Sequence, residues 1–200
     1  MQAAIKVFSE KGYHGATVDD IVAESGTSKG AFYFHFPSKE GMFIALVEEM
    51  AGRLWGAVKT ALKRPGEAGE KIARALYAGL ETFQHNRELA RIALVETAAL
   101  GPELEEKRGL VRRAFLQLIE EHLRELVDDG IVEGLDTRVA ALAFLGTIDE
   151  VVVHWLATGE PEPLVGAASS LVRYNLRAIG LGGGVREVPA YKPVASKSPG

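Results

Sequence analysis

The stretch Thr17–Glu40, TVDDIVAESGTSKGAFYFHFPSKE, decides the fold because it carries the start and stop signals of two short helices. Thr17 is followed three residues later by an acid, a pair that predicts a capped helix start. That helix ends at Gly26, and Ser28 predicts a new N-cap almost at once. Pro37 ends the second helix because the residue before proline is pushed out of the helical region. Short helices joined by a tight glycine turn are typical of a helix-turn-helix unit, whose second helix enters the DNA major groove.

The aromatic side chains in and around this stretch divide into two groups by their spacing. Four of them are predicted to close a small core, namely Phe8, Phe32, Phe36 and Phe43. Tyr33 and His35 cannot share a helix face with these rings, so we expect their polar ends to point outward. Residues 25–39 contain no acid. This segment of an acidic protein can therefore approach DNA phosphates without repulsion.

Helical periodicity runs through the whole chain, since apolar residues recur every three or four positions. A first helix is predicted to end near Lys11, where Gly12 stops it, and Ser38 caps a long helix that ends before Pro65. Further helices are predicted at 68–84, 87–100, 102–129, 137–158 and 161–179. We therefore predict an all-α protein with a helix-turn-helix DNA-binding domain at 1–45, a larger helical domain at 46–180, and a flexible tail at 181–200.

Composition limits the classes of protein that this chain can belong to. It has 200 residues, 47% of them hydrophobic, and a net charge of −4, which is typical of a globular protein and leaves room for a local basic surface. The absence of cysteine excludes disulfides, thiolate zinc sites and cysteine nucleophiles. Charged residues interrupt the N-terminal segment where a signal peptide needs an apolar core, so we expect a cytoplasmic protein with no membrane partner.

Two C-terminal segments suggest self-association. The segment 137–158 is apolar almost all the way round, and the next helix carries a stripe made of Leu164, Ala168, Leu171 and Val172. A monomer would expose this surface to water. We therefore expect both helices to pair with their symmetry mates in a homodimer.

Residues 3–43, AAIKVFSEKGYHGATVDDIVAESGTSKGAFYFHFPSKEGMF, resemble the DNA-binding domain of the tetracycline-repressor (TetR) family of bacterial transcriptional regulators. They keep the family's order of helix, turn, recognition helix, aromatic pair and Pro-Ser-Lys start of the fourth helix. The sequence starts inside the first helix, where relatives usually carry a further turn. The resemblance implies a homodimer that binds a palindromic double-stranded DNA operator through its N-terminal helices. It also implies that residues 46–180 form a regulatory ligand-binding and dimerisation domain, whose small-molecule effector releases the DNA.

The same resemblance implies which residues contact the operator. Thr17 would cap its helix and also hydrogen-bond to a phosphate, and Tyr33, His35 and Lys39 would hold the DNA backbone. The exposed start of the recognition helix would face base edges with Thr27, Ser28, Lys29, Gly30 and Ala31. Lys29 has the reach to contact guanine O6 and N7. Each residue also has a purely structural interpretation, as a cap, a half-buried ring or a solvated lysine, and only their joint spacing favours DNA.

The effector is expected to be lipophilic, because the later helices offer more aliphatic and aromatic bulk than polar groups. Candidate ligand-binding residues are Trp55, Tyr77, Phe83, Arg91, Leu94, Phe115, Leu118, His122, Phe144 and Thr147. His122 also fits a core histidine with its hydrogen bonds satisfied. Arginines at 108–113 favour a phosphorylated molecule such as a fatty acyl-CoA, since guanidinium groups pair well with phosphates.

No catalytic constellation appears in the sequence, so we expect no enzyme activity, no cofactor and no metal. Glu150 and His154 lie one turn apart and could share a metal ion, but the sequence offers no third ligand. The alternative to a ligand-responsive repressor is a helical small-molecule carrier or enzyme that uses the same N-terminal fold without binding DNA. A mobility-shift assay with the protein's own promoter region separates the two.

Overall fold

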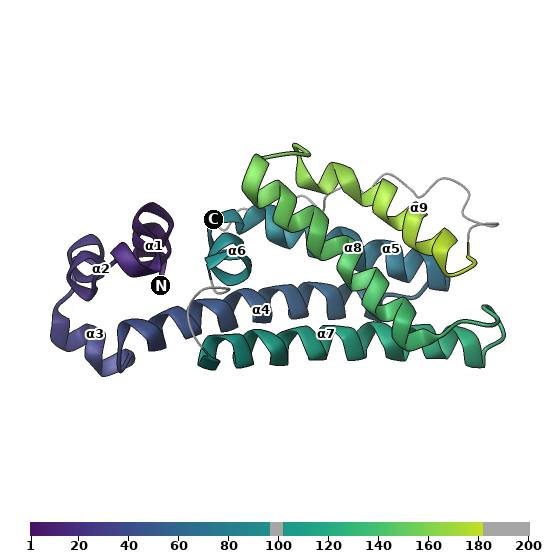
Figure 1. Ribbon diagram of the computed structural model, residues 1–200, viewed down its shortest axis with the longest axis horizontal. Coiled ribbons are helices and arrows are strands. Elements are labelled where there is room, and N and C mark those ends of the chain that lie inside the picture. Colours follow the sequence, from purple (N-terminus) through teal and green to yellow (C-terminus); the bar gives the residue numbers. More distant parts are fainter. Residues whose placement is uncertain (97–101, 182–200) are drawn as a thin grey trace.

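The computed structural model describes residues 1–96 and 102–181, and every regular element within them is a helix. This confirms the all-α prediction. A small N-terminal head, α1 to α3, projects from one end of a larger helical body, and the long α4 runs from the head into the body (Figure 1).

The head contains α1 (Gln2–Gly15), α2 (Val18–Ser25) and α3 (Lys29–His35). Gly12 interrupts α1 with a φ of 67°, a left-handed value that glycine adopts without strain. The predicted capping box is present, because the Asp20 amide donates to Thr17 Oγ1 over 3.1 Å and the Thr17 amide donates to Asp20 Oδ2 over 3.0 Å. These local bonds fix where α2 begins.

Serine side chains start the next two helices. Ser28 Oγ accepts the Ala31 amide at 3.1 Å, and Ser38 Oγ accepts the Gly41 amide at 3.0 Å at the start of α4 (Lys39–Lys63). Phe8 and Phe43 meet edge to face in the head core with ring centroids 5.2 Å apart, and both are fully buried. The aromatic core of the head is therefore as predicted, with Phe32 also buried and Phe36 partly so.

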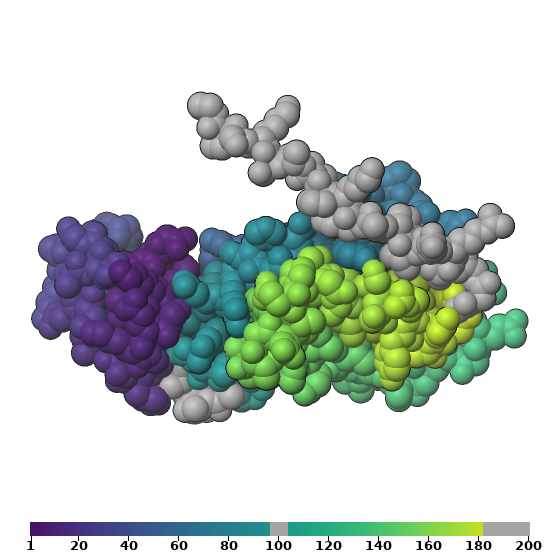
Figure 2. Space-filling view, turned by 90° about the horizontal axis from the view of Figure 1, so that it is seen from above, coloured from purple at the N-terminus to yellow at the C-terminus, as the bar shows by residue number. Residues whose placement is uncertain are grey.

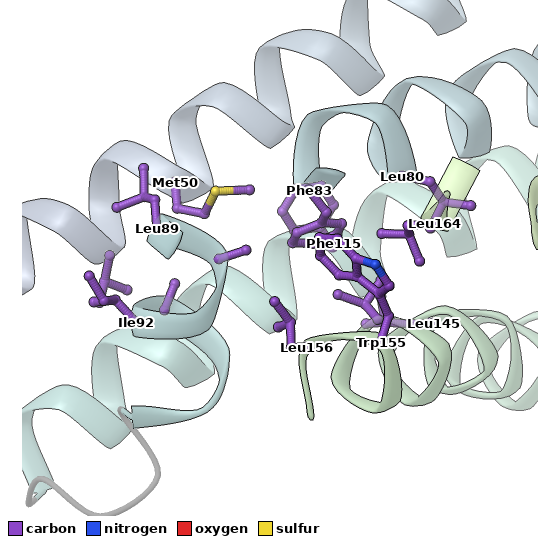
Figure 3. Packing of buried hydrophobic residues seen from close by; sticks show 14 of the residues in the cluster. Met50, Leu80, Phe83, Leu89, Ile92, Phe115, Leu145, Trp155, Leu156 and Leu164 are labelled. Atoms are coloured by element: carbon purple, nitrogen blue, oxygen red, sulfur yellow. The ribbon is translucent and has the colours of Figure 1, made fainter. Parts of the chain in front are cut away.

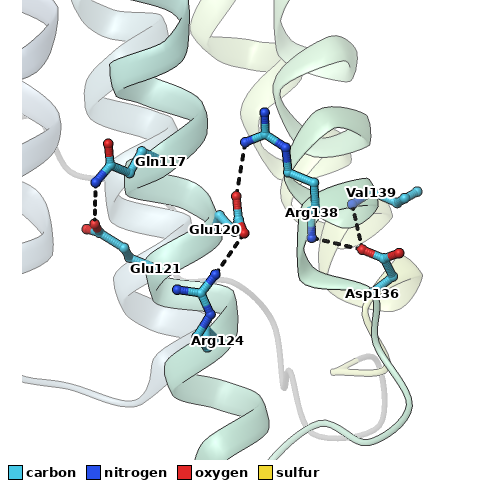
Figure 4. A network of polar contacts seen from close by, with 7 residues as sticks. All are labelled: Gln117, Glu120, Glu121, Arg124, Asp136, Arg138 and Val139. Carbon is cyan, nitrogen blue, oxygen red and sulfur yellow. Dashed lines mark hydrogen bonds and ion pairs between the residues drawn. The ribbon is translucent and has the colours of Figure 1, made fainter.

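The body consists of α5 (Ala68–His85), α6 (Arg87–Leu94), α7 (Pro102–Asp128), α8 (Thr137–Thr158), the short 3₁₀ helix η2 (Leu164–Ala167) and α9 (Ala168–Ala178). α7 runs beside α4, and α8 turns back and packs against α7 (Figure 1). At the turn between α7 and α8, Glu120 accepts bonds from Arg124 at 2.8 Å and Arg138 at 3.0 Å (Figure 4). The contact from Arg138 joins α8 to α7, while the Asp136 side chain caps the start of α8 by accepting the Arg138 and Val139 amides.

One hydrophobic cluster extends from the head to α9, and it includes both Phe8 and Trp155. Within the body, Phe83, Phe115 and Leu145 gather near Trp155, while Met50, Leu89 and Ile92 pack where α4 meets α6 (Figure 3). α6 lies between α1 and the rest of the body and packs against both α1 and α4 (Figure 1). The head is thus joined to the body by packing as well as by the chain.

Two predicted helices differ from the observed ones. The helix predicted at 87–100 is regular only to Leu94, and its last part falls outside the described residues. The helix predicted at 161–179 begins as η2 and becomes α-helical only at Ala168, because Pro161 and Pro163 supply no amide proton and restrict the residues before them. The predicted tail lies outside the described residues except for Leu181.

The stripe proposed for the dimer interface is buried in this chain instead. Leu164, Ala168 and Val172 are 0% exposed and Leu171 is 8% exposed, because η2 and α9 pack against α5. The helical period correctly grouped these residues on one face. It could not tell whether the same chain or a second copy covers that face.

Candidate functional site

Nearly all residues predicted to contact DNA lie on the outer surface of the head. The exposed ones are Thr17, Thr27, Ser28, Lys29, Gly30, Ala31, Tyr33 and His35. They come from the start of α2, the turn and α3, so they share one end of the molecule (Figure 1). Such an arrangement presents a short helix to a groove and places flanking polar groups beside it.

The threonine and serine hydroxyl groups on this surface are already engaged within the chain. Thr17 Oγ1 donates to Asp20 Oδ2 at 2.8 Å, Ser28 Oγ caps α3, and the Thr27 and Ser25 hydroxyls lie 2.7 Å apart. These bonds fix the turn in shape. Any contact from these hydroxyls to DNA would have to use their remaining hydrogen-bonding capacity.

Three exposed ion pairs tie cations of the head to acids of α2. Lys29 Nζ lies 2.7 Å from Asp19 Oδ1, Lys11 Nζ lies 2.6 Å from Asp20 Oδ1, and Lys6 pairs with Glu24. The bond from Lys11 and those from Thr17 lower the pKa of Asp20 to about 2. The segment around α3 lacks acids in sequence, yet Lys29 meets one that the fold supplies from α2.

Lys39 occupies a different position from the one expected for a phosphate contact. Its ammonium group donates to the carbonyl oxygens of Tyr13 at 2.7 Å and Ala16 at 2.9 Å, and it lies 4.3 Å from the centre of the Tyr13 ring. The side chain is half-buried. Lys39 therefore closes the end of α1 and keeps at most one N–H for a phosphate.

Phe34 is a surface residue that the sequence analysis missed. Its ring is 84% exposed on α3, beside Tyr33, which is 53% exposed. An apolar ring so fully in water contributes little to the core. The signal in the sequence was the third consecutive aromatic residue, which a single buried helix face cannot accommodate.

The body contains a cavity of about 410 Å³ between α4, α5, α7 and α8, and its lining on α7 runs from Arg108 to Leu123. This volume is in the range of small-molecule sites in proteins. Six of the predicted ligand-binding residues line it, namely Phe83, Leu94, Phe115, Leu118, His122 and Phe144. The wall is otherwise mostly aliphatic, with Leu54 and Val58 from α4 and Ile148 from α8. The cavity therefore suits a long apolar group.

The other four predicted residues lie outside the cavity wall. Trp55 packs on the cavity-lining residue Phe115 with ring centroids 5.3 Å apart, but it does not line the cavity itself. The Tyr77 hydroxyl lies 2.6 Å from Ser169 Oγ, and Thr147 Oγ1 lies within hydrogen-bond distance of the Asn175 amide, so both residues tie α9 to the body. Arg91 is on the exposed face of α6. Tyr77 and Thr147 were predicted to contact the ligand because the sequence alone does not show that their hydroxyl groups pair with side chains of α9.

Charged groups also form part of the cavity wall. Arg108 and Arg112 line it from successive turns of α7, and the Arg112 guanidinium forms an ion pair with Asp149 of α8. Burial raises the pKa of Asp149, an effect that Arg112 and Arg108 oppose. Further along α7, His122 Nδ1 donates to the Leu118 carbonyl oxygen over 2.9 Å. Asp149 and the role of Arg112 were not predicted, because the pair joins residues 37 positions apart.

The cavity and the head meet at α6. Leu94, at the end of α6, lines the cavity, while the same short helix packs against α1. Glu96, just beyond it, accepts a hydrogen bond from the Tyr13 amide of the head, and burial raises the pKa of this carboxyl group. Among the described residues, no group of three His, Cys, Asp or Glu side chains is placed to hold a metal ion.

Comparison with known proteins gives two family matches. Residues 1–46 match bacterial regulatory proteins of the tetR family, and residues 65–169 match the tetracyclin repressor-like C-terminal domain. The fatty acid metabolism regulator protein of Bacillus subtilis is 30% identical over 180 residues, which cover 90% of this chain and 93% of that protein.

Solved structures of similar proteins have the same fold. The fatty acid degradation regulator FadR from Bacillus halodurans superposes with a TM-score of 0.81 at 28% identity, covering 93% of this chain and 94% of that one. FadR from Bacillus subtilis in complex with stearoyl-CoA superposes with a TM-score of 0.80 at 28% identity, covering 90% and 96%.

Proposed function

Because this chain belongs to the tetR family of bacterial regulatory proteins, we propose that it is a dimeric repressor that leaves its operator when a long-chain acyl-coenzyme A fills the cavity. It is a ligand-responsive transcriptional regulator, and the proposal concerns its ligand, its assembly and its DNA contacts. The observation that carries the ligand is the mostly apolar cavity with the guanidinium groups of Arg108 and Arg112 in its wall.

The chemistry of the cavity matches an amphiphile. An acyl chain would remove its methylene groups from water against Phe115, Phe144 and their aliphatic neighbours, a gain of about 0.8 kcal/mol per buried CH₂. Arg108 and Arg112 would lie beside the polar part of the ligand, where guanidinium groups pair with phosphates. The solved relative with stearoyl-CoA supports the same class of ligand.

Dimerisation is best supported by the outer face of α8. An apolar stretch of this helix has a mean hydropathy of 1.6, yet only 33% of it is buried in the chain. Its exposed stripe comprises Val139, Leu142, Ala143, Glu150, Val153, His154 and Ala157. The helix is also long and apolar enough to cross a membrane, but its other face already packs on α7 and α9.

α9 offers a second surface for the partner subunit. α8 and α9 form adjoining parts of one face of the molecule (Figure 2). Arg173, Tyr174 and Arg177 are exposed on α9, and Glu150 is exposed on α8. In a two-fold interface every contact between two different residues occurs twice, so the acid of each subunit can face the arginines of the other.

Release follows from the geometry of the connection between cavity and head. Two recognition helices must enter successive major grooves roughly 34–36 Å apart, so a small change in separation prevents simultaneous docking. A ligand that displaces Leu94 would push on α6, on which α1 rests, and one that displaces Leu54 or Val58 would tilt α4. The ligand shifts DNA binding only by its differential affinity for the two forms, on the order of 1–3 kcal/mol.

Mobility-shift titration tests this proposal. The purified protein should shift its own promoter region, and palmitoyl-CoA should release the DNA while coenzyme A alone does not. Mass spectrometry of the protein as purified should detect acyl-CoA. Release by a small, strongly polar compound, with no response to acyl thioesters, would reject the ligand and leave the DNA-binding role intact.

A further inference from the structure

We propose that the Asp149–Arg112 ion pair is a selectivity filter in the cavity. It admits ligands with an uncharged joint between apolar tail and head group, and it rejects those whose negative charge sits directly on the tail, such as free fatty acids. This inference rests on the proposed function, because it assumes an acyl ligand. It assigns to Asp149 a role that a cavity for lipids does not otherwise need.

The position of the pair is the first argument. Asp149 comes from α8 and Arg112 from α7, and both line the cavity, where Arg108 and His122 of α7 are the other polar side chains of a mostly apolar wall. The two side chains keep 39% and 45% of their surface exposed, so they lie where the apolar wall gives way to water. A ligand whose tail fills the apolar part must place its first polar atoms near this pair.

Charge balance is the second argument. Arg112 is neutralised by Asp149, so it offers no net positive charge to a carboxylate that arrives at the same place. A free fatty acid would bring a second carboxylate beside the first. Two carboxylates sharing one guanidinium group repel each other, and partial removal from water strengthens that repulsion. The raised pKa of Asp149 indicates that this position already disfavours negative charge through burial.

An uncharged thioester meets no such repulsion. Its carbonyl oxygen can accept an N–H of Arg112 that Asp149 leaves free, since a guanidinium group has five N–H donors. Arg108 lies one turn before Arg112 on α7 and also lines the cavity. Arg108 Nε lies 3.8 Å from Glu105 Oε2, a separation longer than a hydrogen bond, so this guanidinium group can turn to an anionic group further along the head of the ligand. The cavity wall therefore distinguishes a ligand whose negative charge lies at the end of the apolar tail from one whose charge lies further along the head group.

The test measures binding directly, so that it does not depend on operator release. Equilibrium dialysis with radiolabelled palmitate and palmitoyl-CoA gives the ratio of the two dissociation constants. For the wild-type protein we expect palmitate to bind at least about tenfold more weakly. Asp149→Asn should bind palmitate about tenfold more tightly than wild type and leave palmitoyl-CoA within about threefold. Asp149→Glu retains the charge and should keep the wild-type ratio.

Glu125→Gln is the matched control, because it removes one carboxylate from the exposed side of α7, outside the cavity wall. It should leave both dissociation constants unchanged. Equal binding of palmitate and palmitoyl-CoA to the wild-type protein, or an unchanged ratio in Asp149→Asn, overturns the filter without affecting the proposed function. Failure of the wild-type protein to bind palmitoyl-CoA overturns the proposed ligand itself, and with it the filter.

Discussion

The two ends of this molecule hold their charges in different surroundings. In the head, Lys29 and Asp19 form an ion pair in which the side chains are 61% and 67% exposed, and water surrounds both partners. In the body, Arg112 and Asp149 meet at the edge of an apolar cavity, and burial raises the pKa of the acid. The same kind of contact therefore has two physical meanings.

Exposure decides how easily each pair exchanges partners. The lysine of the head can leave its carboxylate for a DNA phosphate at little cost, because exposed pairs contribute little and salt screens them. Replacing Asp149 by a ligand group costs more, because a carboxylate that loses its cation in partly apolar surroundings is poorly solvated. The head is thus suited to reversible contact with any phosphate backbone, and the cavity to selection among ligands.

The largest effect on operator binding is expected from a substitution that breaks the proposed dimer, because the two heads then no longer bind the operator together. Ala143 is exposed at the centre of the apolar stripe on α8, so Ala143→Glu would bury two unpaired charges in the proposed dimer interface. We expect a monomer by sedimentation and operator affinity weaker by about 100-fold or more. Ala143→Ser should remain dimeric. A dimeric Ala143→Glu protein with normal operator binding would place the interface elsewhere.

Removing the ammonium group of Lys39 tests whether this residue stabilises the head or contacts a DNA phosphate. Lys39→Met leaves the carbonyls of Tyr13 and Ala16 without their donor, and we expect the free energy of unfolding to fall by about 1–3 kcal/mol. Urea unfolding measures this, and the exposed Lys63→Met serves as control. Unchanged stability combined with a salt dependence of operator binding reduced by about one unit would show that Lys39 is a phosphate contact.

Phe34 tests whether the head also uses apolar contact. If its exposed ring touches a thymine methyl group, Phe34→Ser should weaken operator binding by about 5- to 30-fold, with stability unchanged within about 0.5 kcal/mol. Replacing single thymines of the operator by uracil should weaken the wild-type protein at one position and leave Phe34→Ser unaffected. An equal response of both proteins to every uracil would show that the ring reads no methyl group.

The smallest effect concerns the ion pair of the head. Asp19→Asn frees Lys29 before DNA arrives, so operator affinity should rise by about two- to fivefold at low salt and approach the wild-type value at high salt. Glu24→Gln frees Lys6 in the same way and reports the general effect of removing an acid. A gain no larger than that of Glu24→Gln would indicate that Lys29 does not reach the operator.

The sequence predicts what depends on neighbours along the chain. The caps at Thr17, Ser28 and Ser38 each bond to an amide three residues on, and all three helices begin where these residues indicate. The family match confirms the assignment to the tetracycline-repressor family that these signals supported. Six of ten predicted ligand-binding residues line the cavity, because bulky apolar side chains on facing helices commonly do so.

Contacts between distant residues were not predictable in the same way. Lys39 bonds to Tyr13, which is 26 positions away, and Arg112 pairs with Asp149 across 37 positions. Helical periodicity gives the face on which a residue lies but not the element that covers it. For that reason Leu171 was assigned to a dimer interface, although α5 of the same chain buries it.

The backbone of a single residue of the head, Tyr13, is held from two sides. Glu96 of the body accepts the Tyr13 amide, Lys39 donates to the Tyr13 carbonyl, and α1 rests on α6 beside them. The head is too small to be very stable by itself, so its packing against the body contributes much of its stability. Chimeric regulators made by grafting this head onto another body would then have to carry α6 and Glu96 with it, and the natural point for such a graft lies after α6 rather than inside α4.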